Sequence, residues 1–254
     1  MRLHTGIGIC TKYKRRPLQY APGQGILSCV ADVSVFTHKD LRVRERLYSL
    51  AQGAALLALG FIADHFAGLY ALSYSTRATS VYVGDMLLDN LPVVNLNLVV
   101  VEGALWAIAL SAVLVALHPR RILFTLKALG LFIIIRAFFI SLTHIGIYPG
   151  QINPGAGIFD AVYSYFNLQT GFFFSGHTAL PFLMALVFWD ERAWRYVYLA
   201  LSAVFAASVL LAHVHYSIDV FAAPFMAYGI FEITRKLFPR DYELLRATEA
   251  ADAI

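Results

Sequence analysis

Residues 121–143, RILFTLKALGLFIIIRAFFISLT, form a nearly continuous apolar run whose only charged side chains are Arg121, Lys127 and Arg136. About twenty such residues can cross a bilayer as a helix, because a helix satisfies its own backbone hydrogen bonds. Five further stretches meet the same criterion, at about 48–74, 97–117, 172–189, 195–214 and 217–238. The sequence therefore predicts an all-α integral membrane protein, folded as a bundle of six transmembrane helices.

The composition agrees with this fold class. Hydrophobic residues make up 59% of the 254 residues and charged residues only 14%, a more apolar balance than that of soluble domains. The formal charge of +4 is small, and in a membrane protein it reflects basic loops rather than nucleic-acid binding. The bilayer is thus an expected partner and nucleic acid is not. Cys10 and Cys29 both precede the first span, so no disulfide framework or thiolate metal site is expected. No cofactor is expected either.

The positions of lysine and arginine predict the orientation. Nine of these residues precede the first span, and further ones lie in the second and fourth connections and in the tail, whereas the long loop 143–171 has none. Because positively charged loops stay in the cytoplasm, both termini are predicted to be cytoplasmic. The expected organisation is a cytoplasmic N-terminal region (1–47), partly disordered or an interfacial helix, a six-span domain (48–238) and a cytoplasmic tail (239–254).

The N-terminal region does not resemble a secretory signal, since its basic cluster is followed by polar and turn-forming residues. This pattern and the predicted orientation favour a multi-pass protein of a plasma or inner membrane. A Golgi-type compartment would give the same topology and remains open.

Two short segments at the edges of apolar runs carry the chemistry. They are Phe174–Thr178, FSGHT, and Ala212–Val220, AHVHYSIDV. The predicted topology places both on the non-cytoplasmic face. Residues four apart share a helix face, so Asp219 is expected to bind one ring nitrogen of His215 and leave the other as a nucleophile. His177 would then protonate a leaving group and later deprotonate an acceptor.

A cation for phosphate is expected at Arg136, in the outer half of the third span. An arginine inside a span normally faces a partner or a wet cavity, and Glu102, near the outer end of the second span, is its expected partner. Asp64 interrupts the first span on the opposite half, where a hydrogen-bonding or packing role is expected. Taken alone, His213 is more typical of an interfacial or packing residue than of a catalyst.

At these residues the chain resembles the sphingomyelin-synthase-like branch of the type 2 phosphatidate phosphatase superfamily, over about residues 48–238. Its Ser-Gly-His-Thr motif matches residues 175–178, its His-x-His-Tyr-(Thr/Ser)-x-Asp-Val motif matches residues 213–220, and its Arg-x(6)-Thr element resembles Arg136 and Thr143. The resemblance implies six spans and a metal-independent triad on the non-cytoplasmic side. The expected residues are catalytic His177, His215 and Asp219, phosphate-binding Arg136, and supporting Ser175, Gly176, Glu102 and His213.

Differences from the family pattern narrow the range of expected substrates. Phosphatase members carry a Lys-x(6)-Arg-Pro element and an arginine six residues before the nucleophilic histidine. Here Val209 takes the second position, and the interval from Lys127 to Arg136 lacks both the spacing and the proline. Fewer phosphate-binding cations favour a singly charged phosphodiester. The synthases often have an acidic residue where this chain has Gly171, so the head group stays open.

These observations predict a lipid phosphotransferase that moves a phospho-head group from a phospholipid donor to a lipid alcohol acceptor, such as ceramide or diacylglycerol, through a phospho-histidine. The alternative is a lipid phosphatase or phospholipase C-like hydrolase that uses the same triad. A non-enzymatic lipid transporter is a third possibility, because intramembrane charge is common in transporters. Against that possibility, the charges cluster near the outer surface and no inverted pair of interrupted spans is visible.

Overall fold

The computed structural model describes residues 25–75, 81–142, 145–152 and 173–247, with side chains described from residue 43 onward. The chain divides into two compact units, Met1–Leu47 and Tyr48–Ile254. The described part of the first unit is the start of helix α1 (Gly25–Ser75), and the remainder of α1 belongs to the second unit. The helices and side chains of the bundle and of the candidate site belong to the second unit. Residues 43–47, with which the first apolar helical segment begins, belong to the first unit.

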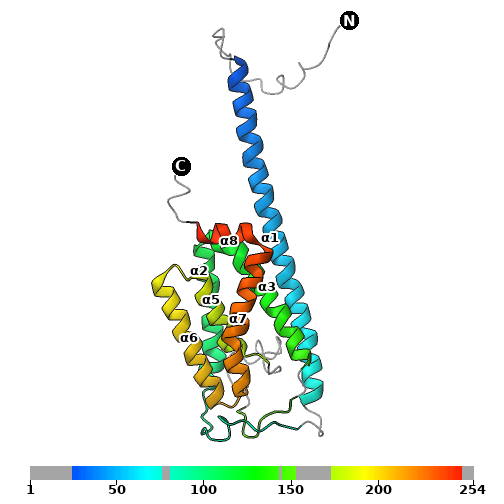
Figure 1. The fold of residues 1–254 in the computed structure, drawn as a ribbon, viewed down its shortest axis with the longest axis vertical. Helices are drawn as coiled ribbons and strands as arrows, with labels where there is room; N and C mark the ends of the chain where they lie inside the picture. The colour runs from blue at the N-terminus through cyan, green and yellow to red at the C-terminus, as the bar shows by residue number, and fades with distance from the viewer. Residues whose placement is uncertain (1–24, 76–80, 143–144, 153–172, 248–254) are drawn as a thin grey trace. The chain divides into compact units, whose positions relative to one another are not determined.

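After α1, the described part of the second unit is a bundle of helices without a strand (Figure 1). The elements are the π-helix η2 (Leu98–Gly103) and the α-helices α2 (Ala104–Leu117), α3 (Pro119–Leu142), α5 (Gly176–Val187), α6 (Arg192–Leu211), α7 (Ser217–Leu237) and α8 (Pro239–Arg246). The predicted all-α class is confirmed.

Five helical segments of the described residues are long and apolar enough to cross a membrane: Val43–Tyr74, Leu98–Leu117, Pro119–Leu142, Arg192–Leu211 and Ser217–Leu237. Large apolar side chains point outward along these segments, with Phe66, Trp106 and Phe225 between 65% and 80% exposed. The surface of a soluble protein would not expose so many large apolar side chains. The chain is therefore a multi-pass membrane protein, whereas the orientation of its termini remains a prediction.

The fourth apolar stretch differs from the prediction. The sequence predicted a span over 172–189, but α5 covers only Gly176–Val187. Ser175 is extended (φ −60°, ψ 113°) and Phe188 already departs from helical geometry, so the helix is only twelve residues long. His177 consequently lies in the first turn of α5, at the start of this short helix.

The short α5 lies at the centre of the core. Its residues from Leu183 to Val187 are buried among side chains of α3, α6 and α7. A helix enclosed by its neighbours does not need the length of a lipid-facing span, because protein rather than lipid surrounds it.

Glycines bring α1 and α3 close together. A Cβ at Gly130 would lie 2.8 Å from the backbone of Leu56, and a Cβ at Gly60 would lie 3.1 Å from the carbonyl oxygen of Gly130. Small residues at such crossings let helix backbones approach in membranes. The same two helices carry Asp64 and Arg136 further along.

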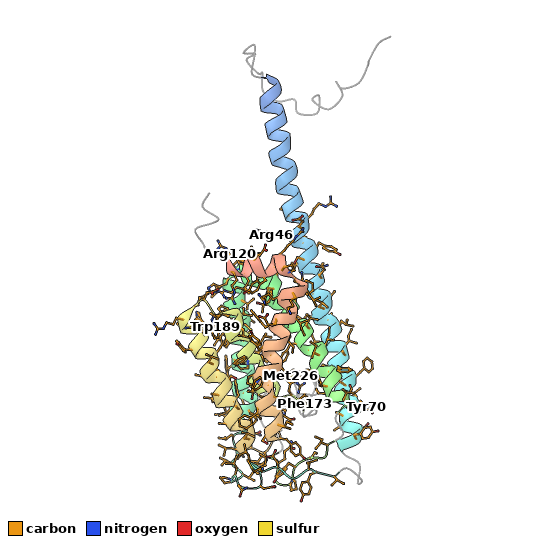
Figure 2. The ribbon with its side chains drawn as sticks, in the orientation of Figure 1. Arg46, Tyr70, Arg120, Phe173, Trp189 and Met226 are labelled. Atoms are coloured by element: carbon orange, nitrogen blue, oxygen red, sulfur yellow. The ribbon has the colours of Figure 1, made fainter. Side chains whose placement is uncertain are left out.

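A separate group of ion pairs lies at the end of the bundle where α8 crosses α7 and α3 (Figure 1). Lys127, which is 2% exposed, donates to Asp241 of α8 at 2.5 Å, to Ser49 at 2.8 Å and to Gln52 at 3.2 Å. The labelled Arg120 and Trp189 lie toward this end in Figure 2, and Phe173 and Tyr70 lie toward the other. Lys127 therefore forms its ion pair at the α8 end of the bundle, and His177, which follows Phe173 closely in the chain, lies toward the other end.

Candidate active site

His177 is held by the backbone of a π-helix. Its Nε2 lies 3.1 Å from the carbonyl oxygen of Val100 in η2. A carbonyl can only accept, so Nε2 carries the proton and Nδ1 is the nitrogen able to accept one. π-helical turns are rare and recur at functional sites. The sequence from Leu98 to Gly103 gave no sign of this contact, because a backbone carbonyl makes it.

His215 lies just before α7, in the connection that follows α6. Helix α7 begins at Ser217, so Asp219 is in its first turn and His215 is outside it. Asp219 Oδ2 lies 3.5 Å from His215 Nδ1 and accepts a 3.1 Å hydrogen bond from the backbone N–H of Tyr216. The predicted contact is present, but its cause is a helix-capping geometry rather than a shared helix face.

A backbone hydrogen bond joins the two motifs. The N–H of Ser175 donates to the carbonyl oxygen of Asp219 at 3.0 Å, which fixes the start of α5 against the first turn of α7. The rings of His177 and His215 are then edge-to-face, with centroids 6.0 Å apart. The structure thus brings together three residues that lie up to 42 positions apart in the chain.

Arg136 reaches the same place from α3. Its Nε donates to the carbonyl oxygen of Phe174 at 3.3 Å. A Cβ added at Gly176 would lie 3.5 Å from this Nε, so the glycine allows the guanidinium close to the start of α5. A cation therefore stands next to the first turn that carries His177.

The acidic partner of Arg136 differs from the prediction. Arg136 donates to Asp64 Oδ1 at 3.2 Å, and within the described residues Glu102 forms no ion pair with it. The expected Glu102 pairing is therefore wrong, as is the placement of Asp64 in the opposite half of its span. The close glycine contacts between α1 and α3 explain why Arg136 pairs with Asp64 rather than with Glu102, since they bring α1, which carries Asp64, next to α3, which carries Arg136.

His213 has an unusual environment. It has a positive φ of 55° and is 3% exposed, and neither ring nitrogen has a hydrogen-bond partner among the described residues. Its ring lies edge-on to Tyr148, with centroids 5.2 Å apart. The φ value turns the chain between α6 and α7 at an energetic cost for a residue with a Cβ, so His213 helps to shape the segment that carries His215.

The segment before α7 is also fixed by the connection that follows α1. Asp85 Oδ2 accepts a 2.7 Å hydrogen bond from the backbone N–H of Ser217, and Asp85 Oδ1 accepts from Leu87 and Leu88. Burial alone would raise the pKa of Asp85, but these N–H donors outweigh it and hold the pKa below its usual value. An ionised Asp85 therefore supports the first turn of α7.

Tyr148 strengthens the same region. It donates to Asp89, which raises the pKa of Tyr148 to about 12 through that hydrogen bond, aided by burial. Tyr148 therefore remains a neutral donor at physiological pH and links the connections before α2 and after α3.

Some expected features fall outside the described residues. Thr143, Gly171 and most of the loop 143–171 belong to this group. Within the described residues no group of three or more histidine, cysteine or acidic side chains is arranged to hold a metal ion.

The geometry offers a defined set of chemical functions. One imidazole is backed by a buried carboxylate, a second imidazole stands beside it, and a guanidinium lies next to the second. Such a group can provide a nucleophile, a proton donor or acceptor, and a binding site for an anion.

The comparison with known families is consistent with this arrangement. Residues 170–237, which include α5, α6, α7 and both motifs, match the family model described as PAP2 superfamily C-terminal. Neither the curated proteins nor the solved structures gave a match. Over these residues the chain is similar to the PAP2 superfamily, and this similarity supports a lipid phosphatase or phosphotransferase type of function.

Proposed function

We propose that the protein is a lipid phosphotransferase that moves a phospho-head group from a glycerophospholipid to a lipid alcohol through a phospho-histidine. The observation that carries this proposal is the contact between the two motifs. The Ser175–Asp219 hydrogen bond places His177 beside the His215–Asp219 pair, and Arg136 adjoins the same turn.

In the first half-reaction, His215 Nε2 attacks the phosphorus atom while Asp219 holds Nδ1 and stabilises the positive charge that develops. The nitrogen–phosphorus bond forms and the bond from phosphorus to the diacylglycerol oxygen breaks. His177, which must enter this step with a proton on both ring nitrogens, donates its Nδ1 proton to that oxygen, which releases diacylglycerol. Because Val100 binds Nε2–H, Nδ1 is the atom of His177 that transfers the proton.

In the second half-reaction, the acceptor hydroxyl attacks the phosphorus atom. Its proton passes to His177 Nδ1, the oxygen–phosphorus bond forms and the nitrogen–phosphorus bond to His215 breaks. The acceptor is ceramide, diacylglycerol or a similar lipid alcohol. If water took its place, the same residues would carry out hydrolysis.

Arg136 binds the non-bridging oxygens of the phosphate in both steps. Lys127 cannot assist, because it is engaged with Asp241 in the remote ion-pair group. Among the lysine and arginine residues that the structure describes, Arg136 is the one seen next to the site, which supports a donor with one negative charge at phosphorus, as in a phosphodiester.

The distribution of lysine and arginine supports a location of this site on the non-cytoplasmic face of a plasma or inner membrane. Two connections that are predicted to be outer, within 81–97 and 145–152, form backbone hydrogen bonds with residues shortly before His215. The N–H of Val94 donates to the carbonyl oxygen of Leu211, and the N–H of Ile152 donates to the carbonyl oxygen of Ala212.

Lipid mass spectrometry tests the proposal. Purified protein in liposomes of phosphatidylcholine and phosphatidylethanolamine is incubated with and without ceramide, and His215→Ala serves as the control. We expect a new phosphosphingolipid only with ceramide, with diacylglycerol released in step. Diacylglycerol and free phospho-alcohol formed regardless of ceramide would instead establish a hydrolase. Equal turnover by His215→Ala would exclude the mechanism.

A further inference from the structure

The ion pair between Asp64 and Arg136 has no role in the proposed chemical steps. It joins two membrane-spanning segments, with an Arg136 NH1 to Asp64 Oδ1 distance of 3.2 Å and side chains that are 13% and 17% exposed. Charged residues inside a span are costly and usually mark a functional pathway. Arg136 of this pair lies beside Gly176, whose neighbour is the candidate acid–base residue His177.

Asp64 changes the charge that a phosphate meets. In the proposed mechanism Arg136 is positive, Asp64 and Asp219 are negative, and His215 must be neutral to act as a nucleophile. The first half-reaction also requires a protonated His177, so these groups together carry no net charge before substrate binds. At short range in a poorly solvated region, one additional negative charge on phosphorus is strongly unfavourable.

We infer that Asp64 is a specificity-determining residue, which makes the site accept singly charged phosphodiesters and reject doubly charged phosphomonoesters. The inference rests on the proposed function, because it concerns the phosphate group bound by Arg136. Asp64 partly neutralises the guanidinium that binds phosphate, so a phosphodiester leaves less uncompensated negative charge than a phosphomonoester, whose second ionisation is near pH 6.

A purely structural role makes a different prediction. If Asp64 only held Arg136 in position, its replacement would weaken the binding of both kinds of phosphate to the same extent. If Asp64 sets the charge, a neutral replacement increases the use of phosphomonoesters relative to phosphodiesters. The ratio between two substrates therefore separates the two roles.

The test compares phosphatidic acid with its methyl ester, phosphatidylmethanol, at identical acyl chains. The two lipids differ by one charge at phosphorus and one methyl group. For Asp64→Asn we expect the ratio of kcat/KM for phosphatidic acid to kcat/KM for phosphatidylmethanol to rise roughly tenfold at pH 7.5. An unchanged ratio, or an equal loss with both lipids, would overturn the inference.

Two further variants control this result. Glu232→Gln removes the acid from another acid–arginine pair of a spanning helix, the 2.6 Å pair with Arg235 in α7, and should leave the ratio unchanged. Asp64→Glu keeps the charge and should retain the preference for the diester. Asp64→Thr supplies a second neutral variant if Asp64→Asn does not fold.

A binding measurement keeps this inference separate from the proposed function. In the His215→Ala background, native mass spectrometry compares binding of phosphatidic acid and phosphatidylmethanol with and without Asp64→Asn. A shift toward phosphatidic acid would support the inference even if the wild type transferred no phospho-head group. Turnover by the wild type without any shift in binding or in the kcat/KM ratio would leave the proposed function intact and overturn the inference.

Discussion

At the level of single residues, the hydrogen-bond partner of each imidazole decides which nitrogen can react. Asp219 lies next to His215 Nδ1 and the Val100 carbonyl lies next to His177 Nε2. In the proposed mechanism the nucleophile is therefore His215 Nε2, and the proton moves through His177 Nδ1. One ring is fixed by a carboxylate that stabilises positive charge, whereas the other is fixed by a neutral carbonyl, which agrees with two different roles.

Replacement of Asp219 by Asn tests the first of these contacts. We expect turnover to fall by about 10²- to 10⁴-fold, because the amide no longer stabilises a positively charged His215. The amide oxygen can still accept from the Tyr216 N–H, so the unfolding temperature should change by only a few degrees. Initial rates of diacylglycerol release measure the first effect and thermal unfolding in detergent the second. Wild-type turnover in this variant would remove Asp219 from the mechanism.

Asp85 gives a prediction for pH dependence. Its pKa is lowered in the folded protein by the N–H donors that outweigh burial. A carboxyl group with a lowered folded pKa contributes stability that is complete above its unfolded pKa, near 4, and is lost as the pH falls through the folded value. Asp85→Asn should therefore unfold at a lower temperature than the wild type at pH 7, and the difference should begin to shrink near pH 4 and close below the lowered pKa of folded Asp85. A difference in unfolding temperature that does not shrink as the pH is lowered from 7 to 3 would contradict this account.

At the level of elements, apolar run length predicted most helices because each lipid-facing span needs a similar number of apolar residues. The run 121–143 corresponds closely to α3, Pro119–Leu142. The same reasoning failed at α5, since a helix enclosed by protein can be short. Hydropathy measures how apolar a run is and does not reveal whether lipid or protein surrounds it.

The candidate site was only partly predictable for a similar reason. Motif spacing and loop charge placed His177, His215 and Asp219 at the same end of the bundle, and the structure brings them together. The partners Val100 and Asp64 could not be predicted. A backbone carbonyl leaves no trace in a sequence, and the choice between Asp64 and Glu102 depends on how the helices are rotated and how closely they approach.

The approach of α1 to α3 can be tested at Gly130. Gly130→Ala would place a methyl group 2.8 Å from the backbone of Leu56, so the helices must separate. We expect a loss of about 1–3 kcal/mol in the free energy of unfolding, together with reduced turnover because Asp64 and Arg136 move apart. Unfolding curves and initial rates measure both effects.

Gly229→Ala is the matched control for this variant. Gly229 lies in α7, and a Cβ there would meet nothing within 4 Å. Because alanine favours helix more than glycine does, the control should be neutral or slightly more stable. Equal behaviour of the two variants would show that close packing at Gly130 is not important.

At the level of the whole molecule, the two ends of the bundle use charge differently. The end with His177 holds the candidate chemistry, and the end with α8 holds the buried Lys127–Asp241 pair. Lys127→Met should destabilise the protein by about 3–5 kcal/mol, because Asp241 loses its partner in a buried setting. Turnover per folded molecule should remain at the wild-type level.

The double variant Lys127→Met with Asp241→Leu separates pairing from burial. Since apolar replacement of both members of a buried pair is often neutral, most of the lost stability should return. Chemical unfolding in detergent measures this recovery. Loss of turnover in the folded double variant would mean that Lys127 does assist phosphate binding, contrary to the assignment of Arg136 as the cation of the site.

The most direct test of phosphoryl transfer is to trap the intermediate. Wild-type protein is incubated with phosphatidylethanolamine in the absence of an acceptor, quenched in base, digested and analysed by mass spectrometry. The account predicts an acid-labile phosphoethanolamine adduct on His215, absent from His215→Ala and lost when a lipid alcohol is added. Continued turnover with no adduct on His215, or an adduct on His177 instead, would contradict it.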